Sequence, residues 1–190
     1  MRKKNASIEF IKTCYALALI KLMKEKDYNN ITISEICKEA GFGRTSYYRY
    51  FTNNKDELIL FISKLKWLEC KNYNPEGAKK DEGKLLLNHV YKNKDFFVLL
   101  RKHNLNALIF EIFYDNFGRQ KNENEILSYG KAFFAGAYFG VIYEWIIEGC
   151  KDTPDTIQVK FDNGFKYTIE QAQKEKESSK NIVWCFYKTL

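Results

Sequence analysis

The segment from residue 32 to residue 51 restricts the fold more tightly than any other part of the chain. Thr32 and Glu35 have the spacing of a capping box, in which the hydroxyl and the carboxylate each bind a free backbone N–H at a helix start. Gly41 then supplies the left-handed residue at which a short helix ends. A second helical run covers residues 44–50. Two short helices across a glycine-containing turn form a helix-turn-helix, which the sequence therefore predicts here.

Apolar residues recur at helical spacing through most of the remaining chain. A stripe from Ile8 to Met23 follows Ser7, a good N-cap, and the longest predicted helix runs from 126 to 149. The chain has only two prolines and ten glycines, which favours long helices over a loop-rich β protein. A polar segment at 71–83 predicts a linker or long loop.

The predicted fold is therefore all-α. It has an N-terminal three-helix helix-turn-helix domain over residues 1–56 and a C-terminal helical ligand-binding and dimerisation domain over residues 57–190. Residues 157–190 are atypical within that second domain, because they do not have the pattern of a long helix.

The atypical segment has the pattern of a β-hairpin. Ile157, Val159 and Phe161 alternate with polar residues, and a second alternating run from Phe165 to Ile169 follows Asn-Gly at 163–164. Two alternating runs around Asn-Gly are the strongest short-range signal for a hairpin. The apolar stretch at 182–187 is also typical of a strand. We therefore expect a β-hairpin near the C-terminus.

The charge of the chain is concentrated near its N-terminus. The formal net charge is +7, and residues 1–65 hold 12 Lys and Arg against 7 Asp and Glu. A basic N-terminal domain suggests a polyanionic partner, either nucleic acid or an anionic membrane, although a merely soluble basic surface is an equal alternative on charge alone. Five widely spaced cysteines, no signal peptide and no transmembrane stretch predict a cytoplasmic protein.

The second helix of the helix-turn-helix has two chemically different sides. Tyr47 and Phe51, four residues apart, are expected to point into the core. The outward side combines guanidinium, hydroxyl and phenol groups, which bind bases and phosphates in a major groove. Its members are Arg44, Thr45, Ser46, Tyr48 and Arg49.

The run ITISEICKEAGFGRTSYYRYF resembles the helix-turn-helix of the TetR/AcrR family of transcriptional regulators. The resemblance covers roughly residues 7–62, and a looser one covers residues 133–157, which are similar to the penultimate helix of the family's ligand-binding domain. It implies that Arg44 and Thr45 contact bases. It also implies that double-stranded DNA is bound by a homodimer, with an unknown small-molecule effector acting on the second domain.

The same resemblance implies further contacts to DNA. Ser46 and Tyr48 match positions that touch phosphates or bases, and Arg49 matches a backbone-contacting position. Lys55 lies near a helix start that grips phosphate in the family, and Ser34 adds a contact from the preceding helix. The sequence departs from the family pattern at two places in this segment. A glycine stands at 43, where the family has a capping residue, and the turn after Phe51 is one residue longer than is usual in the family.

The remaining candidate sites are weaker. Aromatic residues between 96 and 145 could line a pocket for an apolar or flat ligand, and ordinary core packing is the alternative. His89 and His103 have no partners at metal-ligand spacing, so we expect no metal site and surface or helix-end positions for both. Cys150 is the expected exposed thiol. The candidate pocket residues are Phe97, Phe110, Phe113, Tyr138 and Trp145.

These features together predict a sequence-specific transcriptional regulator, a repressor released by a small effector, with no cofactor. The alternative is a constitutive DNA-binding or protein-partner module without effector control. No catalytic motif supports the rival hypothesis of a helical enzyme that uses Cys150 or a histidine. A basic protein bound to a membrane surface is the third rival.

Overall fold

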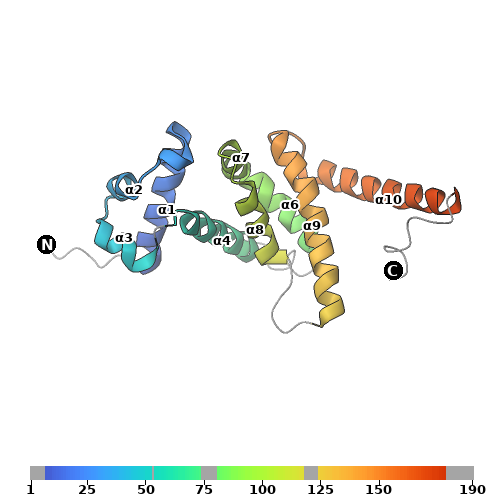
Figure 1. Ribbon diagram of the computed structural model, residues 1–190, viewed down its shortest axis with the longest axis horizontal. Coiled ribbons are helices and arrows are strands. Elements are labelled where there is room, and N and C mark those ends of the chain that lie inside the picture. Colours follow the sequence, from blue (N-terminus) through green and yellow to red (C-terminus); the bar gives the residue numbers. More distant parts are fainter. Residues whose placement is uncertain (1–6, 53, 74–80, 118–123, 179–190) are drawn as a thin grey trace.

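The computed structural model describes residues 7–52, 54–73, 81–117 and 124–178, and these ranges are helical with no strand (Figure 1). The all-α prediction is therefore confirmed. The helices are α1 (Ile8–Glu25), η1 (Tyr28–Asn30), α2 (Ile33–Ala40), α3 (Arg44–Tyr50), α4 (Asp56–Tyr73), α6 (Glu82–Lys92), α7 (Lys94–Lys102), α8 (Asn106–Phe117), α9 (Glu125–Ile147) and α10 (Pro154–Ser178).

The first three α-helices pack around a small aromatic and aliphatic core. Tyr15 and Leu19 from α1, Ile36 from α2 and Tyr47 from α3 are all fully buried. The Tyr15 ring meets the Tyr47 ring edge-on, with 5.3 Å between centroids. Helices as short as α2 and α3 are marginal alone, so this shared core is what stabilises them.

Helix α4 leads from this N-terminal unit into the rest of the molecule (Figure 1). It packs against α1 on one side and against α6 and α8 on the other. Leu58 and Ile59 near its start, and Trp67 near its end, are buried. The predicted domain boundary at residues 56–57 falls in the first turn of α4.

The C-terminal part is a bundle in which α9 packs against α6, α7, α8 and α10. Its core contains Phe97, Leu100, Ile109 and Trp145, each no more than 1 % exposed. At Gly83 of α6 the backbone comes very close to Tyr138 of α9, since a Cβ there would lie 2.2 Å from the phenol oxygen. The two helices could not approach so closely with a larger residue at 83.

The predicted hairpin is wrong, because residues 154–178 form the single helix α10. Ile157, Phe161 and Phe165 are spaced by four residues, so the alternating pattern also fits one face of a helix. Helix α10 packs on α6 and α9: Ile157 is 4 % exposed, and Phe161 stacks on Tyr138 of α9 with 4.7 Å between ring centroids. This packing outweighs the local turn preference of Asn-Gly. The apolar stretch at 182–187 lies outside the described residues.

Two further expectations are corrected by burial. Cys150 is fully buried just after α9, and burial raises the pKa of its thiol to about 11, so it is not an exposed reactive thiol. His89 is 3 % exposed and lies edge-on to Trp67 and Phe97 in the bundle core, not on the surface. The sequence does not predict the burial of His89, because a histidine without an evident partner is expected at the surface.

Candidate DNA-binding site

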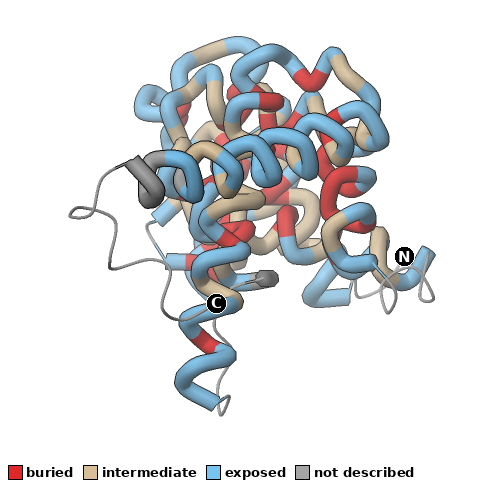
Figure 2. The backbone as a smooth tube through the Cα atoms, turned by 90° about the vertical axis from the view of Figure 1, so that its right-hand side faces the viewer, coloured by how far each residue is buried: buried red, intermediate tan, exposed pale blue. Residues whose placement is uncertain are grey.

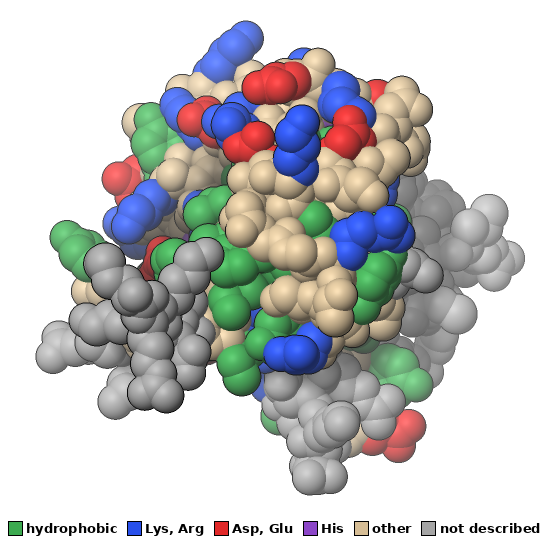
Figure 3. Space-filling model, turned by 90° about the vertical axis from the view of Figure 1, so that its left-hand side faces the viewer, with side chains coloured by type: hydrophobic (Ala, Val, Ile, Leu, Met, Phe, Trp, Pro, Cys, Tyr) green, Lys and Arg blue, Asp and Glu red, His purple; other side chains and the backbone are tan. Residues whose placement is uncertain are grey.

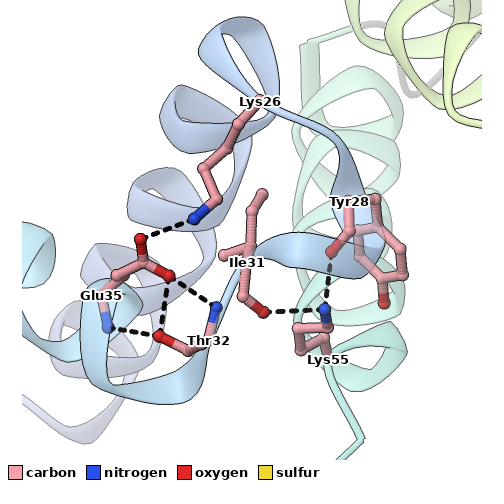
Figure 4. A network of polar contacts seen from close by, with 6 residues as sticks. All are labelled: Lys26, Tyr28, Ile31, Thr32, Glu35 and Lys55. Atoms are coloured by element: carbon pink, nitrogen blue, oxygen red, sulfur yellow. Dashed lines mark hydrogen bonds and ion pairs between the residues drawn. The ribbon is translucent and has the colours of Figure 1, made fainter.

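The start of α2 is fixed by the capping box that the sequence predicted (Figure 4). The Glu35 backbone N–H donates to Thr32 Oγ1 at 3.2 Å, and the Thr32 N–H donates to Glu35 Oε2 at 2.8 Å. Lys26, at the end of α1, forms an ion pair with Glu35 at 2.6 Å. Its ammonium and the two Thr32 donors lower the pKa of the Glu35 carboxyl to about 2. The carboxylate thus ties α2 to the end of α1.

The turn between α2 and α3 depends on Gly41. Its φ is +73°, in the left-handed region, and its N–H closes the end of α2. The chain then passes through Phe42, whose N–H donates to Cys37 O at 3.2 Å, to the N-cap residue Gly43. This geometry sets the angle at which α3 leaves α2.

Gly43 has no side chain that could cap the first N–H groups of α3, but its carbonyl is contacted from α1. The phenol of Tyr15 donates to Gly43 O at 2.9 Å. The sequence shows Tyr15 only as one member of an apolar stripe, because the partner of its hydroxyl is set by tertiary structure. The bond holds the first turn of α3 against α1.

Burial of Tyr47 and Phe51 determines which side of α3 faces solvent. Tyr47 is 0 % and Phe51 6 % exposed. The opposite side is accessible, and Tyr48 keeps 45 % of its surface exposed while its ring rests edge-on against Tyr47, 5.4 Å between centroids. The other exposed members are Arg44, Thr45 and Arg49.

Two predicted contact residues of the helix-turn-helix differ in exposure. Ser46 is half-buried, and its hydroxyl is hydrogen-bonded to Tyr15, so it faces the α1 side of the helix. Ser34 is exposed in the first turn of α2. Figure 3 views this end of the molecule and shows basic side chains spread over the face, with acidic ones mainly toward its top.

Lys55 is placed differently from the rest of the predicted set. Its ammonium points inward and donates to Tyr28 O at 2.6 Å and to Ile31 O at 2.8 Å (Figure 4). It also lies 4.4 Å from the centroid of the Tyr28 ring. Burial lowers the pKa of this half-buried lysine. The structure thus ties Lys55 to the backbone around η1 rather than presenting it beside α3.

The predicted pocket residues are dispersed through the C-terminal bundle. Phe97 and Phe113 are buried and stack on each other with 5.6 Å between centroids. Tyr138 is half-buried, and Phe110 is 41 % exposed. Trp145 is 1 % exposed, and its buried Nε1 has no hydrogen-bond acceptor among the described residues.

A cleft of about 540 Å³ lies elsewhere, where α1 and the end of α3 approach α4 and α8. Lys12, Phe61 and Asp115 are among its lining residues, and none of the five predicted pocket residues is. Among the described residues, no group of His, Cys, Asp and Glu side chains could hold a metal ion.

A helix-turn-helix that exposes arginine, threonine and tyrosine side chains, joined by a long helix to a helical bundle, defines a class of DNA-binding regulators. Two family models match the chain, one over the helix-turn-helix and one over the helical bundle. The model described as "Bacterial regulatory proteins, tetR family" matches residues 18–62, and "Transcriptional regulator C-terminal region" matches residues 84–167. The chain belongs to the TetR family of transcriptional regulators.

A solved structure supports the fold. The dihydroxyacetone kinase operon activator DhaS aligns with a TM-score of 0.51 and 21 % identity, over 84 % of this chain and 96 % of that one. No curated protein sequence matches the chain significantly. In the part of the chain that the structure describes, no helix is both long and apolar enough to cross a membrane.

Proposed function

We propose that this regulator recognises a specific DNA sequence by inserting α3 into the major groove. The exposed side of α3 carries this proposal, because a fully buried Tyr47 fixes its orientation. Arg44 and Thr45 lie in the first turn, where a recognition helix contacts base edges, and an arginine can bind guanine bidentately. Tyr48 and Arg49 contact phosphates or flanking bases.

The proposed working unit is a homodimer that pairs through α9 and α10. Gly136 and Gly140 on α9 have no described atom within 4 Å of a Cβ built on them, so neither glycine is needed for packing within the chain. Large apolar side chains are exposed on the same two helices, and Figure 2 shows many exposed positions on the α10 side of the molecule. They include Ile126, Tyr129, Phe133, Phe134, Ile147, Val159, Phe165 and Tyr167.

Such a dimer would place its two α3 helices in successive major grooves, about 34 Å apart. The proposal therefore includes an operator with two related half-sites separated by one helical turn.

A small effector bound in the C-terminal bundle would regulate DNA binding. It acts only if it binds the DNA-competent and DNA-incompetent conformations with different affinity. The Nε1–H of Trp145 has no acceptor among the described residues, and its ring stacks on Tyr91, so it is a polar group that such a ligand could satisfy.

The proposed sign of regulation is repression by occupancy of a promoter, in a cytoplasmic setting. Activation is the second candidate, favoured by the name of the aligned DhaS, an operon activator. Deleting the gene and measuring transcripts next to the selected site distinguishes the two. Transcripts rise if the protein is a repressor and fall if it is an activator.

The test of sequence recognition is selection from a random duplex library, with wild type and Tyr48→Ala compared. Tyr73→Ala is the matched control, since Tyr73 is 86 % exposed at the far end of α4. We expect wild type and Tyr73→Ala to enrich the same two-half-site sequence, and Tyr48→Ala to enrich it weakly. Failure of wild type to enrich any sequence at low salt would refute the proposal.

A further inference from the structure

One histidine joins the N-terminal unit to the C-terminal bundle. His103 follows the last residue of α7, and its ring reaches the segment between α1 and η1. Its Nε2 lies 2.7 Å from Met23 O, and its Nδ1 accepts from the Tyr28 N–H at 3.3 Å. The same ring therefore contacts the chain on both sides of the two-residue break at 26–27.

These two bonds require one form of the imidazole ring. Because Nδ1 accepts the Tyr28 N–H, it carries no proton, so the neutral ring has its proton on Nε2 and donates it to Met23 O. A doubly protonated ring, or the opposite tautomer, would place an N–H against the Tyr28 N–H. The geometry thus selects the neutral Nε2–H tautomer.

Both partners of His103 are backbone groups at a helix terminus. Met23 O belongs to the last turn of α1, and the Tyr28 N–H is at the first residue of η1. Such groups have no partner within their own helix and need one from elsewhere. His103 supplies both from an element more than 70 residues away, and because hydrogen bonds are directional, the two bonds fix the position of the ring on this segment.

The segment that His103 holds is also tied to the start of α4. The Tyr28 hydroxyl donates to Asp56 Oδ1 at 2.5 Å, and the Lys55 ammonium donates to Tyr28 O at 2.6 Å. Tyr28 therefore connects the end of α1, the start of α4 and the end of α7. A movement of α7 would be transmitted through His103 to the unit that carries α3.

We propose that His103 is a positioning residue for DNA recognition, which fixes the orientation of the helix-turn-helix unit on the C-terminal bundle. In a dimer this orientation sets the separation of the two α3 helices, so the inference rests on the proposed function. Loss of the two bonds leaves α3 intact and removes the contact of this segment with the end of α7, so that the orientation of the unit on the bundle is fixed less tightly. His103 thus controls which half-site spacing is bound, not which bases are read.

The first test needs no DNA. The ¹⁵N shifts of the His103 ring report its tautomer, and the protection factor of the Tyr28 amide reports its bond to Nδ1. We expect the Nε2–H tautomer, and a roughly fivefold or greater loss of Tyr28 protection in His103→Phe, as for one lost hydrogen bond. The neighbouring exposed residue gives the control, Lys102→Ala, which keeps wild-type protection. The opposite tautomer or unchanged protection in His103→Phe would overturn the proposal.

The second test uses the DNA site selected by wild type and a version with one base pair inserted between the half-sites. The insertion moves the half-sites apart by about 3.4 Å and rotates one against the other. Wild type and Lys102→Ala should discriminate strongly between the two duplexes, whereas His103→Phe should discriminate at least fivefold less. An equal loss of affinity on both duplexes would show a merely structural role and overturn the inference. If wild type selects no site, the proposed function fails, and the amide and tautomer measurements still decide whether the contact exists.

Discussion

Tyr15 illustrates how a single side chain of α1 helps to position α3. The N-cap position of α3 is a glycine without a side-chain cap, and the Tyr15 phenol donates to its carbonyl from α1. A tertiary contact of this kind orients α3 relative to α1, which a local cap does not do.

Tyr15→Phe removes the bond to Gly43 O and the bond to the Ser46 hydroxyl while keeping the buried ring. We expect a loss of about 1–2 kcal/mol in the free energy of unfolding, as for one or two hydrogen bonds within a folded protein. Urea unfolding measures it, with Tyr73→Phe as the control, because Tyr73 is exposed. An unchanged midpoint would mean that these two bonds add no net stability, since Gly43 O also accepts from the Ser46 and Tyr47 N–H groups.

Gly83→Ala should destabilise the bundle even though alanine favours a helix. The new Cβ would lie 2.2 Å from the Tyr138 oxygen and 2.9 Å from its Cζ, so the Tyr138 ring must move from its place against Phe161. We expect a net loss of about 1–3 kcal/mol, typical of overpacking. In a protein that also carries Tyr138→Leu, Gly83→Ala should leave the free energy of unfolding unchanged. Equal losses in both backgrounds would contradict the steric explanation.

His89 should make the protein acid-sensitive. Burial, followed by the nearby charges of Lys66 and Lys92, lowers the pKa of its imidazole from 6.5 to about 4. Between these two values the unfolded chain binds a proton that the folded protein does not, so stability falls as the pH decreases through this window. The total loss is up to about 3 kcal/mol.

The measurement is the urea midpoint at several pH values between 7 and 4. His89→Phe keeps an aromatic ring between Trp67 and Phe97 and should flatten the decrease across that range. A decrease as steep as that of wild type would show that another group is responsible.

At the scale of elements, α2 and α10 show what local sequence does and does not determine. Helix α2 begins after its capping box at Thr32 and ends at Gly41, as predicted, because both signals act within a few residues. The start of α3 was predicted from the same glycine turn. Helix α10 was missed, because Asn-Gly at 163–164 favours a hairpin locally, and the helix is stabilised by packing on α6 and α9, which local sequence does not show.

The capping box at the start of α2 is expected to contribute to the stability of the protein. Thr32→Ala removes the acceptor of the Glu35 N–H and should cost about 1 kcal/mol of stability. Ser34→Ala, two residues further along the same helix, removes an exposed hydroxyl and should leave stability almost unchanged. Urea unfolding of both variants is the comparison, and similar losses would mean that the box contributes nothing specific.

For the whole molecule, the sequence predicted the class of fold and the exposed residues of α3 other than Ser46, since both follow from periodicity; Ser46 is half-buried on the α1 side. It did not predict where Lys55 and His103 would point. Lys55 is held by two carbonyls around η1, and His103 reaches α1 from α7, contacts that only the assembled helices create. The predicted pocket residues are all aromatic, and aromatic side chains also pack in protein cores, so the sequence could not distinguish a pocket from the core.

The proposed dimer can be tested by changing one exposed residue of α9. Phe133→Arg places a charge on the exposed face of α9, where Phe133 is 53 % exposed. We expect the protein to sediment as a monomer at micromolar concentration, with unchanged helix content. Glu111→Arg on the exposed side of α8 is the control and should remain dimeric. If Phe133→Arg is still a dimer, the subunits pair through another surface.

The most direct test of the account is the ratio of dissociation constants for the selected duplex and a random duplex, measured for wild type, Arg44→Ala and Lys166→Ala at two salt concentrations. Lys166 is an exposed residue of α10, so its substitution removes one positive charge away from α3. If α3 reads bases, Arg44→Ala should lose roughly tenfold or more on the selected duplex and much less on the random one, while Lys166→Ala keeps the wild-type ratio. If Arg44→Ala weakens both duplexes equally, Arg44 contributes only charge, and the claim that α3 reads the sequence is contradicted.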